Sequence, residues 1–425
     1  MAQSPGGLGT GRRRTLVALM LATGILTVGE GAFNVLLAPH LQQQGLSQAM
    51  IGTVVATFSV TALLGRPLTS YLYTARRSAV IVAVGCVTSA LAYVGVSQSS
   101  LPLTFAALLG AHGIGVALST TGGMAAIMDV SGGSKPGSLM GWYTGAIGAG
   151  YAVAAFLGGA SGDLLGLSQA ILAIASLPVV AGVLLAIVLT LSLRPGGRGG
   201  SAKSAPDEGA SETRGDYRQP QTMDRSERIR RLAKGPPSVW LASAVALHIN
   251  LLNGFLTTYF PLYALSVGLS LTQVGVLLGV HSIIGSAVRF LAPAIFRYVQ
   301  PRQVLSLLVV VGGCGVAVMA SSSSMLLLGA ISMVIGFARG LLRVSSAALV
   351  MEATTSADGT RGVGSGIYLA GLDAGKIIGP ALGGLLVQAF GYAFAFVLAG
   401  LGFPLVYVEL SRRLRRGRRE ADATP

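Results

Sequence analysis

The stretch RPGGRGGSAKSAPDEGASETRGDYRQPQTMDRSERIRRLAKGPP, residues 194–237, is the most polar part of the chain. It holds ten of the thirty Lys and Arg residues and six of the fifteen Asp and Glu residues. It is rich in Gly, Ser and Pro, so it cannot bury enough apolar surface to fold by itself. We therefore predict a disordered linker that separates two apolar parts of the chain, 15–193 and 238–411.

The composition of the chain indicates a membrane protein. Hydrophobic residues make up 52% of the sequence and charged residues only 11%, with a mean hydropathy of +0.69. A soluble protein of 425 residues needs more charge to cover its surface. The sixty glycines suit close contacts between helices in lipid. The sequence therefore predicts an all-α integral membrane protein.

Twelve apolar runs are long enough to cross the hydrocarbon core of a bilayer. The first, from Thr15 to about His40, is too long for the core of a signal peptide. The runs before the linker cover 15–40, 48–73, 78–97, 101–128, 138–162 and 169–193. Those after it cover 238–266, 271–297, 303–322, 325–351, 362–388 and 392–411. We predict two six-helix bundles with short polar tails at 1–14 and 412–425.

The positions of the basic residues predict the orientation. With the N-terminus in the cytoplasm, 25 of the 30 Lys and Arg residues fall on the cytoplasmic side and the other five lie within helices. This distribution follows the positive-inside rule and places both termini and the linker in the cytoplasm. It also accounts for the net charge of +15 without a nucleic-acid partner. The basic C-terminal tail could in addition bind anionic lipid at the cell membrane.

The two halves of the chain repeat one another. A shift that aligns Gly45-Leu46-Ser47 with Gly268-Leu269-Ser270 also aligns Glu30-Gly31 with Asn253-Gly254 and Arg66 with Arg289; we call this the first alignment. A slightly longer shift, the second alignment, matches several glycines as well, among them Gly158-Gly159 with Gly383-Gly384 and Gly166 with Gly391. Internal repeats of a six-helix unit are typical of secondary transporters, whose substrate binds between the repeats.

The chain resembles the major facilitator superfamily over residues 15–411. The loop after the second helix ends in the basic pair Arg76-Arg77 and is similar to the motif that the family carries in this loop. Thr74 stands where the family has Asp. A motif that the family's antiporters carry in helix 5, G-P-x-x-G-G, stands here in helix 11 as Gly379-Pro380-Ala381-Leu382-Gly383-Gly384. The resemblance implies twelve helices in two pseudo-symmetric halves, alternating access and a monomer.

Glu30 is the first candidate for chemistry. It lies within the first apolar run, with Asn34 one turn further on. A charge at the bilayer centre is costly, so such a carboxyl persists when it is protonated, paired or facing a cavity. A group of this kind suits the binding and release of protons, and it resembles the acid that proton-coupled drug exporters of the family carry in helix 1. The alternative is a carboxyl that only holds neighbouring helices together.

Helix 11 is the second candidate site. Gly371, Gly375, Gly379 and Gly383 recur every four residues and predict a ridge for tight helix packing. Asp373 and Lys376 lie off that ridge and could face a central cavity together, where Asp373 would take part in proton coupling and Lys376 in substrate binding. Alternatively, the two side chains neutralise each other at a spacing of three residues.

Further polar residues lie in other helices. Helix 7 carries His248 and a stripe of Asn250, Asn253 and Thr257, which we expect to line the substrate cavity or to form hydrogen bonds between helices. Arg339 in helix 10 could bind an anionic group or pair with an acid. Gating or structural roles are expected for Arg66, Arg289, Arg76 and Arg77, and in helix 11 for Gly375, Gly379, Pro380 and Gly383.

The function that these features favour is secondary transport of a small organic solute, with proton-coupled export as the preferred form. Uptake or facilitated diffusion is the nearest alternative, and a non-transporting receptor with the same fold is a further one. The sequence has no motif for a nucleotide, a metal or a catalytic nucleophile, so no cofactor and no enzymatic activity are expected. Cys86 and Cys314 lie in separate apolar runs, which argues against a disulfide.

Overall fold

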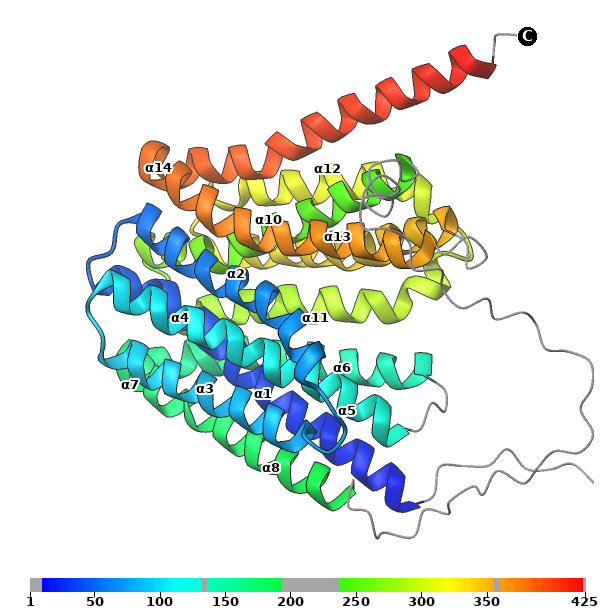
Figure 1. The fold of residues 1–425 in the computed structure, drawn as a ribbon. Coiled ribbons are helices and arrows are strands. Elements are labelled where there is room, and N and C mark those ends of the chain that lie inside the picture. Colours follow the sequence, from blue (N-terminus) through cyan, green and yellow to red (C-terminus); the bar gives the residue numbers. More distant parts are fainter. Residues whose placement is uncertain (1–9, 132–135, 193–236, 355–359, 423–425) are drawn as a thin grey trace, which may run out of the picture.

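The computed structural model describes residues 10–131, 136–192, 237–354 and 360–422, and within these ranges the chain is helical, without strands (Figure 1). The first half comprises α1 (Thr10–Gln43), α2 (Gln48–Leu72), α3 (Ser78–Gln98), α4 (Pro102–Val116), η1 (Ala117–Thr121), α5 (Gly122–Ser131), α6 (Pro136–Leu165), α7 (Leu167–Ile174) and α8 (Ser176–Ser192). The second half comprises α10 (Pro237–Ser266), α11 (Leu271–Ile295), α12 (Pro301–Met319), α13 (Met325–Ala353) and α14 (Thr360–Asp422). Nearly all of the predicted linker lies outside the described residues.

The helices agree with twelve membrane crossings. Ten described segments are long and apolar enough to span a bilayer, and Gln303–Met319 is a shorter apolar helix. The last of the ten, Gly364–Glu409, has 46 residues and is broken at Gly391, so it holds two crossings. Helix α1 begins at Thr10 and α14 runs to Asp422, beyond the apolar runs, because hydropathy marks the membrane core and not the helix end.

Positive φ angles mark the internal repeat. The described glycines with positive φ are Gly45 (83°), Gly268 (88°), Gly166 (79°) and Gly391 (76°). They form two pairs, Gly45 with Gly268 in the first alignment and Gly166 with Gly391 in the second. Each lies in a tight turn between helices, where a side chain would be strained. All four turns lie at the same end of the molecule, which we call the far end; the linker end, opposite, holds Leu72, Ser192 and Pro237 (Figure 1).

The repeated Gly-Leu-Ser segments now have a structural explanation. Gly45 makes the turn, Leu46 is buried in the core, and the side chain of Ser47 accepts a hydrogen bond from the backbone N–H of Met50 at the start of α2. In the second half, Ser270 caps α11 in the same way through Gln273. Each segment therefore ends one crossing and starts the next.

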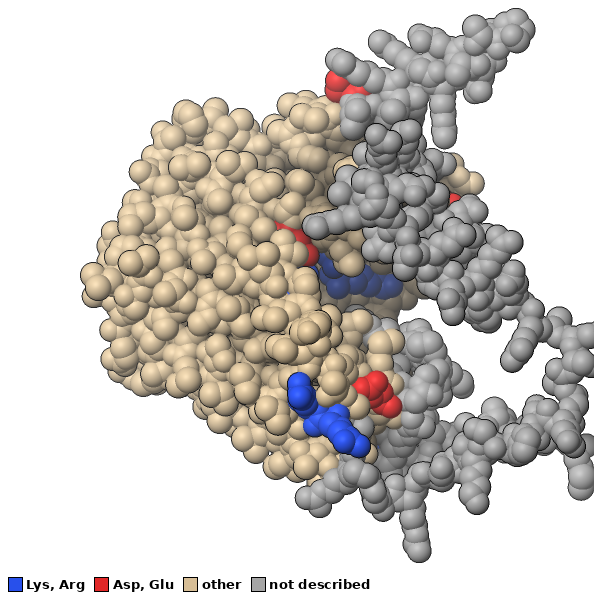
Figure 2. Space-filling model, in the orientation of Figure 1, with Lys and Arg blue, Asp and Glu red and all other residues tan. Residues whose placement is uncertain are grey.

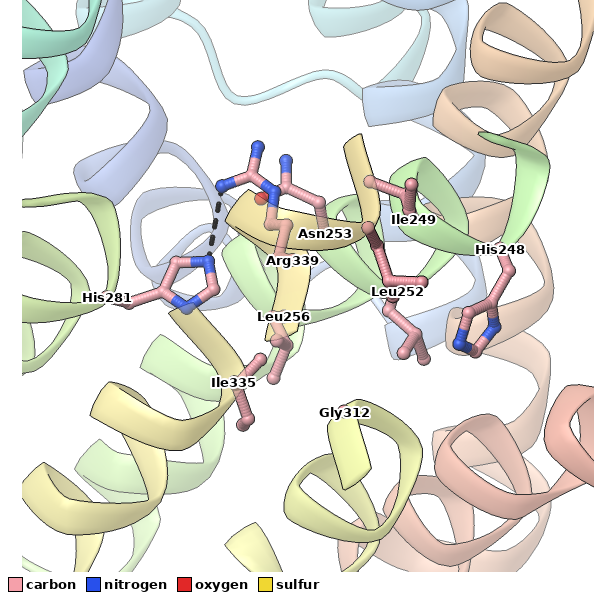
Figure 3. Close-up of a pocket in the computed structure, with 10 residues that line it drawn as sticks. His248, Ile249, Leu252, Asn253, Leu256, His281, Gly312, Ile335 and Arg339 are labelled. Carbon is pink, nitrogen blue, oxygen red and sulfur yellow. Dashed lines mark hydrogen bonds between the residues drawn. The ribbon is translucent and has the colours of Figure 1, made fainter. Parts of the chain in front are cut away.

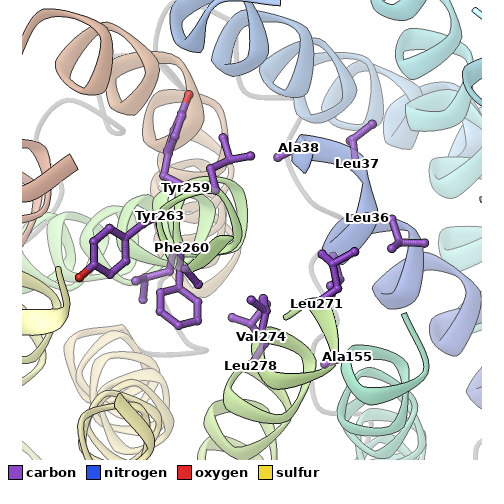
Figure 4. Close-up of a cluster of buried hydrophobic side chains, with 14 of the residues drawn as sticks. Leu36, Leu37, Ala38, Ala155, Tyr259, Phe260, Tyr263, Leu271, Val274 and Leu278 are labelled. Carbon is purple, nitrogen blue, oxygen red and sulfur yellow. The ribbon is translucent and has the colours of Figure 1, made fainter. Parts of the chain in front are cut away.

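The hydrophobic cores of the two halves merge at one end only. One cluster at the far end contains buried side chains from both halves, among them Leu37 and Ala38 of α1 with Tyr259 and Phe260 of α10 (Figure 4). The other two clusters each lie within a single half, one from Leu16 to Leu189 and one from Ala242 to Tyr407. The far end is therefore closed, and the halves diverge toward the linker end (Figure 1).

Glycines allow the close approach of the halves at the far end. A Cβ atom on Gly52 of α2 would overlap the carbonyl oxygen of Pro380 in α14, and one on Gly275 of α11 would overlap that of Ala155 in α6. Gly52 and Gly275 are repeat partners, and so are Ala155 and Pro380. The two contacts between the halves are thus copies of one another.

The predicted glycine ridge, which lies in the first part of α14, packs against α10. Cβ atoms on Gly371, Gly375 and Gly379 would meet the backbone of Ser243, Leu247 and Leu251, and one on Gly383 would meet the rings of Phe255 and Tyr259. The contacted residues of α10 also recur every four positions. Small residues on one helix therefore receive the backbone of the other, as expected for close packing in lipid.

Two side chains cap helices of the opposite half at the far end. The carboxylate of Asp163, in the last turn of α6, accepts hydrogen bonds from the backbone N–H groups of Leu271 (3.0 Å) and Thr272 (2.7 Å) at the start of α11. The side-chain oxygen of Gln388 accepts one from Ala49 at the start of α2 (3.0 Å). Asp163 and Gln388 are repeat partners in the second alignment. We call these two interactions the far-end caps.

Loss of a far-end cap is expected to open the far end more often. Asp163→Ala should have the larger effect, because removal of an N-cap acceptor costs about 0.5–2 kcal/mol and the carboxylate also interacts with the helix dipole. The measurement is the rate of maleimide labelling at Ala38→Cys in a background without Cys86 and Cys314, since Ala38 is only 2% exposed in the closed far end. We expect about threefold faster labelling for Asp163→Ala. A larger effect of Gln388→Ala would contradict this ranking.

Candidate functional site

A hollow between the two halves opens toward the linker end, with charged side chains visible inside it (Figure 2). Seven charged residues from helices of both halves lie in the middle of the bundle, between the closed far end and the linker end. We call them the central charged layer. Five are basic and two are acidic: Arg66, Arg289, Arg339, Arg343, Lys376, Glu30 and Asp373.

Glu30 lies in this layer together with Tyr151 of α6. The hydroxyl of Tyr151 forms a hydrogen bond with the Glu30 carboxyl, and Lys376 is near enough to interact with its charge. Gly31 makes room for the tyrosine, because a Cβ atom there would lie 2.8 Å from Cδ1 of Tyr151. Tyr151 was not predicted from the sequence, although the repeat contained a signal: Tyr151 is the partner of Lys376 in the second alignment.

Asp373 is paired with an arginine of the other half. Nη1 of Arg66 donates to both carboxylate oxygens of Asp373, each at 2.9 Å, so α2 and α14 are linked across the interface. The Asp373 side chain is 13% exposed and the Arg66 side chain 42%. The internal alternative, Asp373 with Lys376, is therefore not the ion pair that forms. The Lys376 side chain is exposed, and its positive charge is near enough to interact with the Glu30 carboxyl.

Two of the three arginines that the second half contributes to this layer form hydrogen bonds with neutral side chains. Nη1 of Arg339 donates to Nε2 of His281 (3.2 Å), and Nη1 of Arg343 donates to Oδ1 of Asn250 (3.5 Å). The Nε atoms of Arg289 and Arg339 are buried and have no hydrogen-bond partner among the described residues. Figure 3 shows the Arg339 guanidinium beside the Asn253 side chain, above an apolar wall that includes Leu252, Leu256 and Ile335.

The polar residues expected in the cavity have different surroundings. Asn253 lines the pocket beside Arg339, whereas Asn250 is buried and donates to the backbone oxygen of Leu372 (2.8 Å). His248 is buried, stacks on Phe403 at 4.3 Å and points away from Arg339 (Figure 3). Thr257 donates to the backbone oxygen of Asn253 in its own helix. Asn34 is partly buried in α1, one turn beyond Glu30.

The residues assigned to gating lie at two levels. Arg76 and Arg77 are exposed in the turn after α2 at the linker end. In the same turn, the Tyr73 hydroxyl donates to Asp129 (2.7 Å), and burial together with this carboxylate raises the pKa of Tyr73. Pro380 contacts Gly52 at the interface between the halves. Within the described residues, no group of three or more His, Cys, Asp or Glu side chains is arranged to hold a metal ion.

Comparison with known proteins identifies the family. The family model of the Major Facilitator Superfamily matches residues 19–358. No curated protein matches the sequence. The structure is similar to that of a bacterial homologue of the human lysosomal transporter Spinster, in an inward-facing and unoccupied conformation, with a TM-score of 0.73 and 15% identity over 95% of this chain and 96% of that one.

A second solved structure supports the same fold. The nucleoside transporter NupG has a TM-score of 0.68 and 12% identity, and the similarity covers 93% of this chain and 98% of NupG. At these identities the solved structures establish the fold and not the substrate. The matched residues, the twelve crossings and the hollow between two repeated halves lead to one conclusion: the chain belongs to the major facilitator superfamily and is a multi-pass membrane transporter, not an enzyme.

Proposed function

We propose that this chain is a proton-coupled secondary transporter of a small organic solute, with Glu30 as the proton-binding group. The observation that carries the proposal is the place of Glu30 in the central charged layer, where it forms a hydrogen bond with Tyr151 and lies near enough to Lys376 for their charges to interact. A carboxyl at this place can bind a proton, or, when it is ionised, interact with the positive charge of Lys376. Proton binding then changes the charge of the layer that a bound solute would contact.

The structure also supports alternating access as the mechanism. We propose that the linker end faces the cytoplasm, as the basic residues predict, so that the hollow is open to the cytoplasm in this conformation. A solute would enter from that side. Release on the other side would require the shared far-end cluster and the far-end caps to separate, while the two clusters confined to single halves move as rigid bodies.

Export by proton exchange is the first candidate for the direction, because the resemblance to proton-coupled exporters favours it. Uptake together with protons is the second, and the charge interaction between Glu30 and Lys376 favours it, because protonation of Glu30 would free Lys376 for a solute with a negative group. The two candidates predict opposite proton movements when a solute enters a vesicle. Exchange makes the vesicle interior alkaline, and uptake together with protons makes it acidic.

The test uses proteoliposomes with a pH dye inside and a panel of lipophilic cations, sugars, amino acids and organic acids outside. We expect one class to cause proton movement in the wild type and none in Glu30→Gln, because the amide cannot bind the proton. Glu352→Gln is the control, since Glu352 is an exposed acid at the linker end. Full proton movement in Glu30→Gln would contradict the proposal. Solute movement that is unaffected by an uncoupler would indicate facilitated diffusion.

A further inference from the structure

The two repeated arginines have unequal partners. Arg66 pairs with Asp373, which is 307 positions away in the sequence and belongs to the other half. Its repeat partner Arg289 would need an acid at the position that corresponds to Asp373 in the second alignment. That position is Gly148, where a Cβ atom would lie 2.8 Å from Oγ of Ser286 in α11. Close packing therefore replaces the carboxylate that would have balanced Arg289.

Arg289 also has two further arginines close to it. Arg339 and Arg343 are near enough for the three positive charges to repel one another. The hydrogen-bond partners found for Arg339 and Arg343 in the described part of the chain are the neutral side chains of His281 and Asn250. A positive charge that is partly withdrawn from water is costly when no counter-charge lies beside it. Among the described residues, Arg289, Arg339 and Arg343 lie close together and none of them forms an ion pair with an acid, which suits a site for a negative group.

The surroundings of the cluster also fit a ligand. Each of the three side chains is partly exposed, and basic side chains are visible inside the hollow (Figure 2). Asn253 adds an amide beside Arg339, and the wall next to it is apolar, with Leu252, Leu256 and Ile335 (Figure 3). Guanidinium groups bind carboxylate and phosphate oxygens through paired hydrogen bonds, and the apolar wall suits a hydrocarbon or aromatic portion.

We propose that Arg289, Arg339 and Arg343 form a binding site for the anionic group of the transported solute, a carboxylate or a phosphate attached to an apolar portion. This inference rests on the proposed function only in that the chain binds a small solute in the hollow. It does not depend on proton coupling or on the direction of transport.

The test is equilibrium dialysis of the purified full-length protein against four naphthalene compounds that share one ring system. 2-Naphthoate and 2-naphthyl phosphate carry the negative group, 2-naphthalenemethanol is neutral, and 2-naphthylmethylammonium is positive; protein-free micelles give the background. We expect at least one anion to bind about tenfold more tightly than the neutral and positive compounds. Arg339→Gln and Arg289→Gln should each reduce this binding about tenfold, while Arg339→Lys should keep part of it.

The control variant is Arg297→Gln, which removes one exposed arginine in the turn after α11. Its affinity for the anions should equal that of the wild type. Absence of binding by both anions, equal binding of the positive compound, or unchanged binding in folded Arg339→Gln and Arg289→Gln would overturn the inference. If the vesicle assay then showed proton-coupled movement of a cation or a sugar, the proposed function would stand and only the anionic site would be rejected.

Discussion

Gly275→Ala is expected to keep the far end open and to reduce transport about tenfold or more. The added methyl group would overlap the carbonyl oxygen of Ala155, and its Cβ would lie 3.2 Å from Cα of Gly159. Both neighbours are backbone atoms, so no side-chain rotation relieves the overlap. Overpacking of this kind costs about 1–3 kcal/mol, and here the cost falls only on the conformation with a closed far end. The equilibrium should therefore shift toward the other conformation.

The same helix provides the control for this prediction. A Cβ atom on Gly279, one turn further along α11, would be 3.4 Å from the Ala152 carbonyl oxygen, which is an ordinary contact. Gly279→Ala should transport like the wild type. Labelling at Ala38→Cys should be fast in Gly275→Ala and slow in Gly279→Ala. Slow labelling in both variants, or normal transport in Gly275→Ala, would show that the far end closes without this contact.

Asp373→Asn is expected to reduce transport strongly, and removal of Arg66 as well should restore part of it. The single variant leaves the Arg66 guanidinium in the central charged layer without its carboxylate, whereas Arg66→Gln with Asp373→Asn leaves two neutral groups. The partial exposure of Arg66 lowers the cost relative to a fully buried ion pair. We expect a loss of about tenfold in the single variant and a smaller loss in the double variant.

This double-variant cycle also separates two roles of Asp373. If the residue only pairs with Arg66, the double variant should still move protons with the solute. If Asp373 itself carries protons, the double variant should move solute without protons. The measurement is the ratio of proton to solute flux in the same vesicles. Equal damage in the single and double variants would contradict the expected restoration.

The fold could largely be predicted from the sequence, because its two determinants are local. Apolar length places each crossing, and the turn residues Gly45, Gly166, Gly268 and Gly391 mark equal positions in the two halves. Local distortions were missed. The π-helical turn Ala117–Thr121 and the break between α7 and α8 near Ala175 leave hydropathy unchanged, so a pattern of apolar residues does not reveal them.

The candidate site could be predicted only as a set of residues. Hydropathy identified Glu30, Asp373, Lys376 and the arginines as unusual within apolar runs. Their partners depend on which helices meet across the interface, and sequence spacing only allowed Lys376 as one possible partner of Asp373. The structure instead brings Arg66 of α2 to Asp373. Tyr151 was missed because a tyrosine in an apolar run is not unusual by itself.

The far-end caps have a consequence for the order of events during transport. Identical repeats would give two caps of equal strength, and separation could then start on either side. Here the charged carboxylate of Asp163 accepts two hydrogen bonds, whereas the neutral amide of Gln388 accepts one. The weaker cap should break first, so the Gln388 cap on α2 should open before the Asp163 cap on α11, while the Arg66–Asp373 pair still links α2 and α14 in the central charged layer. The repeat that built a symmetric molecule therefore leads to an asymmetric opening step.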